Sequence, residues 1–466
     1  MSLGIREGEV SHYFFPRYSR LFFNNAFLDY PFQKKNFDLV IIIPVLSDLP
    51  QVGDALRTIF EFKSSYNSSK SILIIWMTDE TSSSKVSTLE SFWGYFLSRQ
   101  DFHSVDDLYL IEIENRCKVN NWGGKLDHIF TMINDVNFSF AFFHTISNKA
   151  LSTSFELNLL LENGILNNSD LNLAAYVIPY YKGVMINFWL MPLSYLFGRE
   201  IRNPVPFDFI FSRETFDYWM TLPPLETNHL SATYLQLIFS IFMSGLRITE
   251  FFLGDKEDHI SFYSQESMPE LIQTGINLVE RHKKFIKNST ALINTHNHVQ
   301  YSVPFNIYCV SDIDNILKVY LKDNTFSGKK FDDLIKKHLS KEHYDRIKIF
   351  TRKASPKFRK IGSYGDTWDF VFLSILQAYI ESQSQSRKKQ IFQIFVSLFS
   401  IKSKIWAEEI KNMIVETEEK SRNDAQRGCP WRGGDAGKHW HIHDLFEKKL
   451  SEDYSRMHTL RNNFFQ

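Results

Sequence analysis

The chain has 466 residues, of which 44% are hydrophobic and 23% charged, a balance typical of folded domains rather than of disordered chains. Lys plus Arg and Asp plus Glu are equal at 53 each, which argues against a nucleic-acid binder, since that class usually carries a basic excess. A chain of this length holds about two to four domains of ordinary size.

Three cysteines, Cys117, Cys309 and Cys429, lie far apart, so we expect a reducing compartment and no disulfide framework. The opening MSLGIREGEVSHYFF has early charges and lacks the apolar core of a signal peptide. The longest mostly apolar stretch, residues 184–197, is shorter than the roughly 18–20 residues that cross a bilayer. These features predict a cytoplasmic protein with no transmembrane segment. The 43 phenylalanines predict an aromatic core and an apolar surface suited to an oligomer or a protein partner.

In chain order, the first 260 residues alternate between strand and helix patterns. Apolar and β-branched runs predict strands at residues 37–46, 71–80, 106–115, 140–145, 171–183 and 246–254. Apolar spacing predicts helices at residues 52–66 and 123–136. This order is typical of an open, mostly parallel sheet with helices on both faces. Ligands of such sheets bind beyond the carboxyl ends of the strands, here at residues 44–48, 78–80, 115–118 and 144–148.

After about residue 285 the pattern changes to amphipathic helices. They are predicted at residues 326–350, 365–382, 387–420 and 442–465. We therefore predict two domains, an α/β domain over residues 1–285 and a mainly helical domain over residues 286–466.

The glycine-rich loop before the last predicted helix contains potential metal ligands, Cys429, His439, His441 and His443. If the loop is extended, the three histidines share one face, because side chains alternate along a strand. Their spacing matches no standard zinc pattern. A metal site and a polar loop that happens to contain histidines both remain open.

Five segments stand out near the predicted strand ends. They are DLVIIIPVLSD (38–48), IIWMTDETSSS (74–84), NNWGGKLDHIF (120–130), PLSYLFGREIRNPVPFDFIFS (192–212) and FFLGDKEDHIS (251–261). Taken in this order, they resemble the GT-A-fold nucleotide-sugar glycosyltransferases, in particular the branch that contains mannosylglycerate synthase and glucosyl-3-phosphoglycerate synthase. The resemblance covers most of the chain, including the helical extension, and rests on the order of the segments rather than on one motif.

The resemblance implies a GT-A fold, a Rossmann-like α/β architecture with a mostly parallel sheet, that binds a UDP- or GDP-linked sugar and transfers the sugar to an acceptor. It implies a catalytic role for Asp208 and a metal-binding role for His259. The implied nucleotide- and sugar-binding residues are Pro44, Asp48, Asp79, Lys125, His144, Ser147 and Arg202. From the residues alone, other roles stay open: Asp79 also fits a helix N-cap, Asp48 a turn and His144 a backbone-bonded loop residue.

The sequence departs from the family at three places. The family's Asp-x-Asp motif would fall at residues 144–146, His-Thr-Ile, or one position later, where there is no acid. Its Pro-x-Gly-Gly turn becomes Pro-Val-Pro-Phe at 204–207, and its Ile-Asp-Thr helix start becomes Ser-Ala-Thr at 231–233. Hard ions such as Mg²⁺ and Mn²⁺ prefer carboxylate oxygens, so any binding of these cofactors should be weak. Basic residues would then hold the phosphates; the candidates are Lys125, Lys149, Arg199 and Arg202.

Three hypotheses follow: a glycosyltransferase with little or no metal dependence, a degenerate GT-A module that serves as a binding or regulatory subunit, and an unrelated doubly wound α/β protein. A dinucleotide-dependent oxidoreductase is disfavoured because no Gly-x-Gly-x-x-Gly follows the first strand. A serine hydrolase is disfavoured because the chain lacks a Gly-x-Ser-x-Gly elbow.

Overall fold

The chain divides into two compact units, which are described separately. The computed structural model describes residues 19–23, 36–44, 57–59, 61–62, 65, 72–77, 108–113, 121–145, 152–177, 184–201, 203–255, 267–288, 293–294, 329–353 and 365–426. Unit 1 comprises residues 1–176, 203–262 and 295–299, and unit 2 comprises residues 177–202, 263–294 and 300–466. The domain boundary predicted from the sequence, between residues 285 and 286, stays a prediction, and both units cross it.

Unit 1 is built on a single eight-stranded sheet. In spatial order its strands are β1 (Ser19–Phe23), β4 (Leu108–Ile113), β3 (Ile72–Met77), β2 (Asn36–Pro44), β5 (Asn137–His144), β8 (Asp208–Ser212), β6 (Leu171–Val177) and β9 (Ile248–Asp255). The first five of these strands pair in parallel. Strand β8 is antiparallel to both β5 and β6. The predicted α/β class with a mostly parallel sheet is confirmed.

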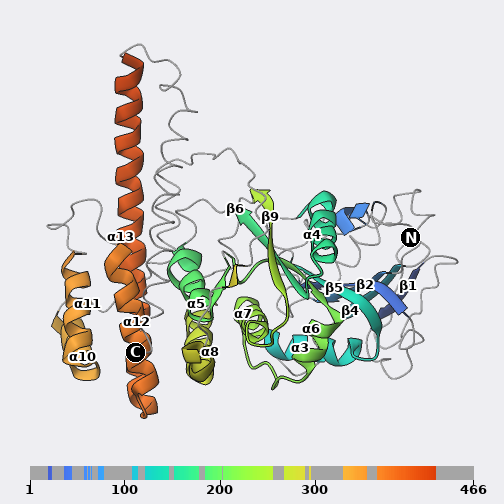
Figure 1. Ribbon diagram of the computed structural model, residues 1–466, viewed down its shortest axis with the longest axis horizontal. Helices are drawn as coiled ribbons and strands as arrows, with labels where there is room; N and C mark the ends of the chain where they lie inside the picture. The colour runs from blue at the N-terminus through green and yellow to red at the C-terminus, as the bar shows by residue number, and fades with distance from the viewer. Residues whose placement is uncertain are drawn as a thin grey trace, which may run out of the picture. The chain divides into compact units, whose positions relative to one another are not determined.

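Four helices of unit 1 flank this sheet: α3 (Trp122–Ile133), α4 (Ser154–Leu166), α6 (Arg213–Met220) and α7 (Leu230–Ile241). In Figure 1, α4 lies on one side of the sheet, and α3, α6 and α7 lie on the other. Strands β2 and β5 are almost entirely buried along their last residues because helices cover both faces. The continuous apolar run at residues 37–43 reflects this double coverage.

The core on the α3–α6–α7 side is aromatic, as the high phenylalanine content predicted. Phe143 of β5 contacts Phe209 and Phe211 of β8, with ring centroids 4.8 and 5.5 Å apart. Phe211 also packs on Trp219 of α6 at 4.8 Å, and Phe209 meets Tyr234 of α7 edge to face at 4.9 Å. Residues 143, 209 and 211 share this face since side chains alternate along a strand. The same alternation sends residues 142, 144 and 208 to the side of α4.

Unit 2 is mainly helical. It contains a π-helical turn, η3 (Ile186–Leu190), followed by α5 (Met191–Leu196), α8 (Ser267–Asn288), α10 (Lys329–His338), α11 (Lys341–Lys353), α12 (Gly365–Glu381) and α13 (Gln385–Gln426), with a short parallel pair of strands, β7 (Arg199–Glu200) and β10 (Ile293–Asn294). The sequence predicted the helices that correspond to α10–α13. The last predicted helix, at residues 442–465, lies outside the described residues, as does the loop with Cys429, His439, His441 and His443.

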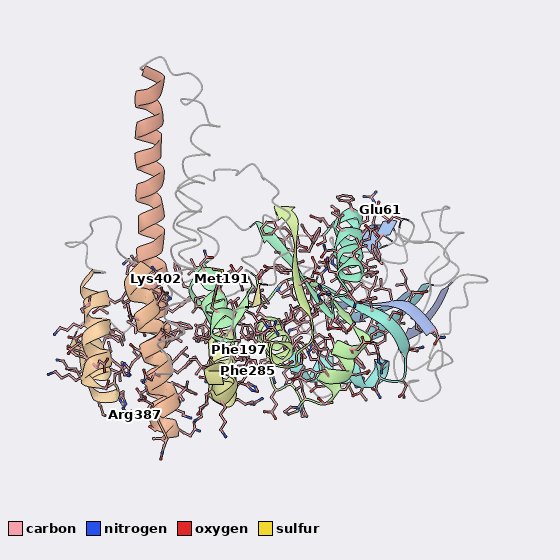
Figure 2. All side chains as sticks on the ribbon, in the orientation of Figure 1. Glu61, Met191, Phe197, Phe285, Arg387 and Lys402 are labelled. Atoms are coloured by element: carbon pink, nitrogen blue, oxygen red, sulfur yellow. The ribbon has the colours of Figure 1, made fainter. Side chains whose placement is uncertain are left out.

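Two tryptophans organise the core of unit 2. Trp189 and Trp368 are both fully buried, and both contact Phe395 of α13, with ring centroids 5.2 and 6.0 Å away. The indole Nε1 of Trp368 donates a hydrogen bond of 3.0 Å to the carbonyl of Phe188. Figure 2 labels Lys402 on α13, whose ammonium group lies 4.5 Å from the centre of the Phe188 ring. Tilted and edge-to-face aromatic contacts thus join α13 and α12 to the π-helical turn.

Arg387, also labelled in Figure 2, connects α13 to α10 through two hydrogen bonds from its guanidinium group to the carbonyl of His338, at 3.1 and 2.9 Å. This carbonyl lies at the end of α10, where helical carbonyls lack partners within the helix. Among the residues that the structure describes, none of the helices combines the length and the apolar character needed to cross a membrane.

The substitutions Gly275→Ala and Gly164→Ala should change stability in opposite directions. Both glycines lie within helices, where alanine is favoured by up to about 1 kcal/mol. A Cβ atom at residue 275 would lie 2.5 Å from the ring of the buried Trp189, whereas at residue 164 its nearest neighbour would be 3.4 Å away. Urea unfolding should show Gly275→Ala destabilised by about 1–3 kcal/mol, with Gly164→Ala unchanged or more stable. A neutral Gly275→Ala would contradict the packing described here.

Candidate functional site

The candidate site lies where the strand order of unit 1 changes direction. From β2, the chain proceeds through β3 to β4 on one side, and then crosses to β5 on the other side of β2. In open α/β sheets such a switch point leaves a crevice beyond the carboxyl ends of the two neighbouring strands. Strand β2 ends at Pro44 and β5 ends at His144, and the strands are parallel, so both ends lie at the same edge.

At this edge, His144 and Asp208 form a buried pair. They lie opposite each other in the register between β5 and β8, and the imidazole Nδ1 is 2.8 Å from Oδ1 of Asp208. Both side chains have no solvent exposure. An ionised carboxylate only accepts hydrogen bonds, so Nδ1 carries the shared hydrogen and donates it to Asp208. The carboxylate therefore fixes both the orientation and the tautomer of the ring, as in catalytic and metal-binding histidines.

The second carboxylate oxygen of Asp208 accepts hydrogen bonds from two hydroxyl groups. Tyr176, near the end of β6, donates through its phenol at 2.6 Å, and the Ser152 hydroxyl donates to the same oxygen. The two hydroxyl oxygens lie 2.9 Å from each other. Hydroxyl and imidazole donors stabilise a buried carboxylate, whose charge would otherwise be costly to remove from water. Asp208 thus connects four segments that are separated along the chain.

Thr145, the residue after His144, is anchored on the opposite face of the sheet. Its hydroxyl oxygen lies 2.9 Å from the phenol oxygen of Tyr234 on α7, and its amide donates to the carbonyl of Phe207 at 3.2 Å. Consecutive residues at the end of β5 are therefore anchored on different sides of the sheet. The Pro-Val-Pro-Phe segment at 204–207 is buried beside this point.

Lys125 lies in the first turn of α3, and the backbone amides of that turn are largely engaged. Gly123 donates its amide hydrogen to the carbonyl of Thr227 at 2.9 Å, and Gly124 donates to the side chain of Asn121 at 2.6 Å. A Cβ atom on Gly123 would lie 2.4 Å from the Leu225 carbonyl oxygen, so glycine is required there for close approach. The Lys125 ammonium group lies 4.7 Å from the centre of the Trp122 ring. A phosphate-binding role for Lys125 stays a prediction.

Several predicted site residues lie outside the described part of the chain: Asp48, Asp79, Ser147, Lys149, Arg202 and His259. Pro44 is the last residue of β2, and its nucleotide-binding role stays a prediction. Arg199 belongs to unit 2, where it is buried and burial lowers the pKa of its guanidinium group. Within the residues that are described, there is no group of three or more His, Cys, Asp or Glu side chains that could hold a metal ion.

The sequence analysis missed Ser152, Tyr176 and Tyr234. Tyr176 lies within a predicted strand as one of several apolar residues, and Ser152 precedes a helix, α4, that was not predicted. A capping signal was present, because Thr153 and Glu156 form a capping box at the start of α4. That signal could have located the helix, but not the hydrogen bond from Ser152 to Asp208, which depends on the pairing of β8 with β5 and β6.

No protein-family model matches the sequence, and no curated protein matches it either. Among solved structures, mannosyl-3-phosphoglycerate synthase from Rubrobacter xylanophilus is similar with a TM-score of 0.38 and 14% identity, over 53% of this chain and 76% of that one. Glucosyl-3-phosphoglycerate synthase from Mycobacterium tuberculosis, in complex with Mn²⁺, UDP-glucose and phosphoglyceric acid, is similar with a TM-score of 0.34 and 11% identity, over 51% of this chain and 80% of that one. Likeness at this level transfers no residue role, ligand or activity to this chain.

The stability of unit 1 should fall as the pH rises above about 10. Burial raises the pKa of Tyr176 well above its usual value of 10.0, and the negative charge of Asp208 raises this pKa further. Burial also raises the pKa of Tyr234. Above pH 10 the unfolded chain loses protons that the native state keeps, so each tyrosine lowers the free energy of unfolding by up to about 1.4 kcal/mol per pH unit.

Urea unfolding at pH 9, 10 and 11, followed by tryptophan fluorescence, measures this slope. Tyr176→Phe should reduce the slope, because phenylalanine has no proton to lose. Tyr218→Phe is the comparison and should reduce the slope less, because Tyr218 is partly exposed and burial raises its pKa less than that of Tyr176. Equal slopes for wild-type protein and Tyr176→Phe would show that Tyr176 is not buried beside Asp208.

Proposed function

We propose that unit 1 has a GT-A fold, binds a UDP- or GDP-linked sugar at the switch point between β2 and β5, and transfers the sugar to an acceptor hydroxyl. The observation that carries this proposal is the His144–Asp208 pair. It lies at the ligand-binding edge of the sheet, at the place where the family's metal-binding motif falls in the sequence. An oriented imidazole at that place can donate or accept a proton.

The geometry refines the role proposed for Asp208. Its carboxylate is fully buried and bonds His144, Tyr176 and Ser152, so we assign it the role of a positioning residue that acts through the imidazole. His144 is then the side chain that faces the ligand. This arrangement follows the general logic of a base held by a third group, in which the carboxylate fixes the ring and does not itself react.

The remaining assignments come from the order of the sequence segments. Pro44 ends β2, and Asp48 and Asp79 come soon after β2 and β3 in the sequence, so we propose all three as contacts for the nucleotide base and ribose. Lys125, Ser147 and Arg202 are proposed contacts for the phosphates and the sugar. His259 is proposed as a weak ligand for Mg²⁺ or Mn²⁺. The acceptor is a small molecule or a glycan.

A second candidate function, a binding or regulatory subunit that lacks catalysis, is favoured by the burial of the site. Neither His144 nor Asp208 reaches solvent, and the replaced turn at 204–207 is buried as well. A catalytic group must come within about 3 Å of the reacting atom. If this burial persists when ligand binds, the module recognises a nucleotide sugar without turning it over.

Isothermal titration with UDP and GDP, each in excess EDTA and then with Mn²⁺, tests the proposed function. We expect one of the two nucleotides to bind in EDTA, and Mn²⁺ to strengthen binding by less than about tenfold, because hard divalent ions bind poorly to sites with few carboxylates. Absence of binding by both nucleotides under both conditions would refute the proposal.

Variants and turnover separate the two candidate functions. Asp79→Ala should weaken nucleotide binding by roughly tenfold, the loss of about one charged hydrogen bond, while the matched change Asp217→Ala on the exposed side of α6 should leave it unchanged. Release of UDP or GDP from nucleotide hexoses, lost in His144→Gln, would identify an enzyme. Binding without release would favour the regulatory module.

A further inference from the structure

Only one of the two ring nitrogens of His144 takes part in the buried pair. Nδ1 bonds Asp208, whereas Nε2 has no hydrogen-bond partner within the described part of the chain, although it is shielded from solvent. The ring itself is well fixed, since it also stacks on Phe142 with centroids 5.9 Å apart. A buried polar atom without a partner costs about 1–3 kcal/mol, so its presence calls for an explanation.

Within the part of the chain that the structure describes, the charges that act on the residues bonded around this pair are negative. The titratable groups near the pair, among described residues, are Asp208 on β8, Tyr176 on β6, Tyr234 on α7 and Glu156 on α4. Burial and the charge of Asp208 raise the pKa of Tyr176 and of Tyr234, so both phenols stay neutral near pH 7. With a neutral imidazole, the pair therefore carries the single negative charge of Asp208.

This charge opposes a diphosphate. Two anions separated by one imidazole ring repel each other, and burial strengthens the repulsion because solvent screening is reduced. A proton on Nε2 favours diphosphate binding in two ways. It makes the pair neutral overall, and it turns Nε2 from an acceptor into a donor that can bond a phosphate oxygen.

We propose that the His144–Asp208 pair binds the diphosphate of a nucleotide sugar together with one proton. The proton is taken from solvent onto Nε2, and the resulting imidazolium neutralises part of the phosphate charge, as a divalent cation would. This inference rests on the proposed nucleotide-sugar binding. Because Nε2 is covered in the structure, the atoms above it must move before ligand enters, and association should be slower than for an open pocket.

A metal-binding role for the same nitrogen makes the opposite prediction. A carboxylate–histidine pair often presents a neutral imidazole to a cation, and metal binding requires the unprotonated nitrogen. Nucleotide binding through a cation on Nε2 would then take up no proton and would depend on the metal. A purely structural histidine would show neither proton uptake nor dependence on the metal.

Titration of UDP-glucose and GDP-mannose into the full-length protein in EDTA, at pH 7.5 in three buffers of different ionisation enthalpy, measures the protons exchanged. The diphosphate of a nucleotide sugar has no group that titrates near pH 7.5, so any uptake belongs to the protein. We expect an uptake approaching one proton. The affinity should also fall by up to tenfold for each further unit of pH.

His144→Gln and Tyr176→Phe are the paired variants. Glutamine keeps a donor for Asp208 but cannot take up a proton, so uptake should vanish and affinity should become independent of pH. Tyr176→Phe removes a neighbouring hydroxyl and keeps the imidazole, so uptake should persist. If His144→Gln does not fold, as judged by circular dichroism, a wild-type count near zero still overturns the proposal.

The outcomes separate the two proposals. Binding without proton uptake in EDTA, or binding that appears only with Mn²⁺, overturns the proton-coupled role of His144 and leaves nucleotide-sugar binding intact. Absence of binding by the nucleotide sugars, by UDP and by GDP overturns the proposed function itself.

Discussion

The structure of unit 1 depends on one buried negative charge. Isolated carboxylates are excluded from protein interiors by the cost of losing water, so the residues around Asp208 must compensate. They do so with an imidazole, a phenol and an aliphatic hydroxyl that come from the ends of β5 and β6 and from the residue before Thr153 at the start of α4. The helix, the two strands and β8 must therefore all be in place before the charge is stabilised. The proposed ligand-binding edge and the stability of the fold share the same contacts.

The parts of the fold that could be predicted from the sequence are those whose burial pattern is visible without long-range contacts. Strands such as 37–44 are buried on both faces, so their apolar runs are visible without any tertiary information. The amphipathic helices of unit 2 are visible for a similar reason. Strand β8 is different, because its antiparallel place between β5 and β6 is a long-range property. Asp208 and His144 were predicted as separate site residues, but their pairing across β5 and β8 was not.

The structure also adds to what the sequence shows about residues 144–146, where the family's acids are absent. The sequence shows only that the motif is absent, whereas the structure shows a histidine held by a carboxylate from another strand. An acid, Asp208, is therefore present at this edge, and it is hydrogen-bonded to the imidazole.

Two described residues on either side of positions 146–151 are attached to the same group. His144 and Ser152 both bond the carboxylate of Asp208, so the chain leaves and returns at one point. The entropy of closing a segment between fixed ends changes only slowly with its length. Substitutions, insertions and deletions between these two anchors should therefore leave the sheet largely unaffected.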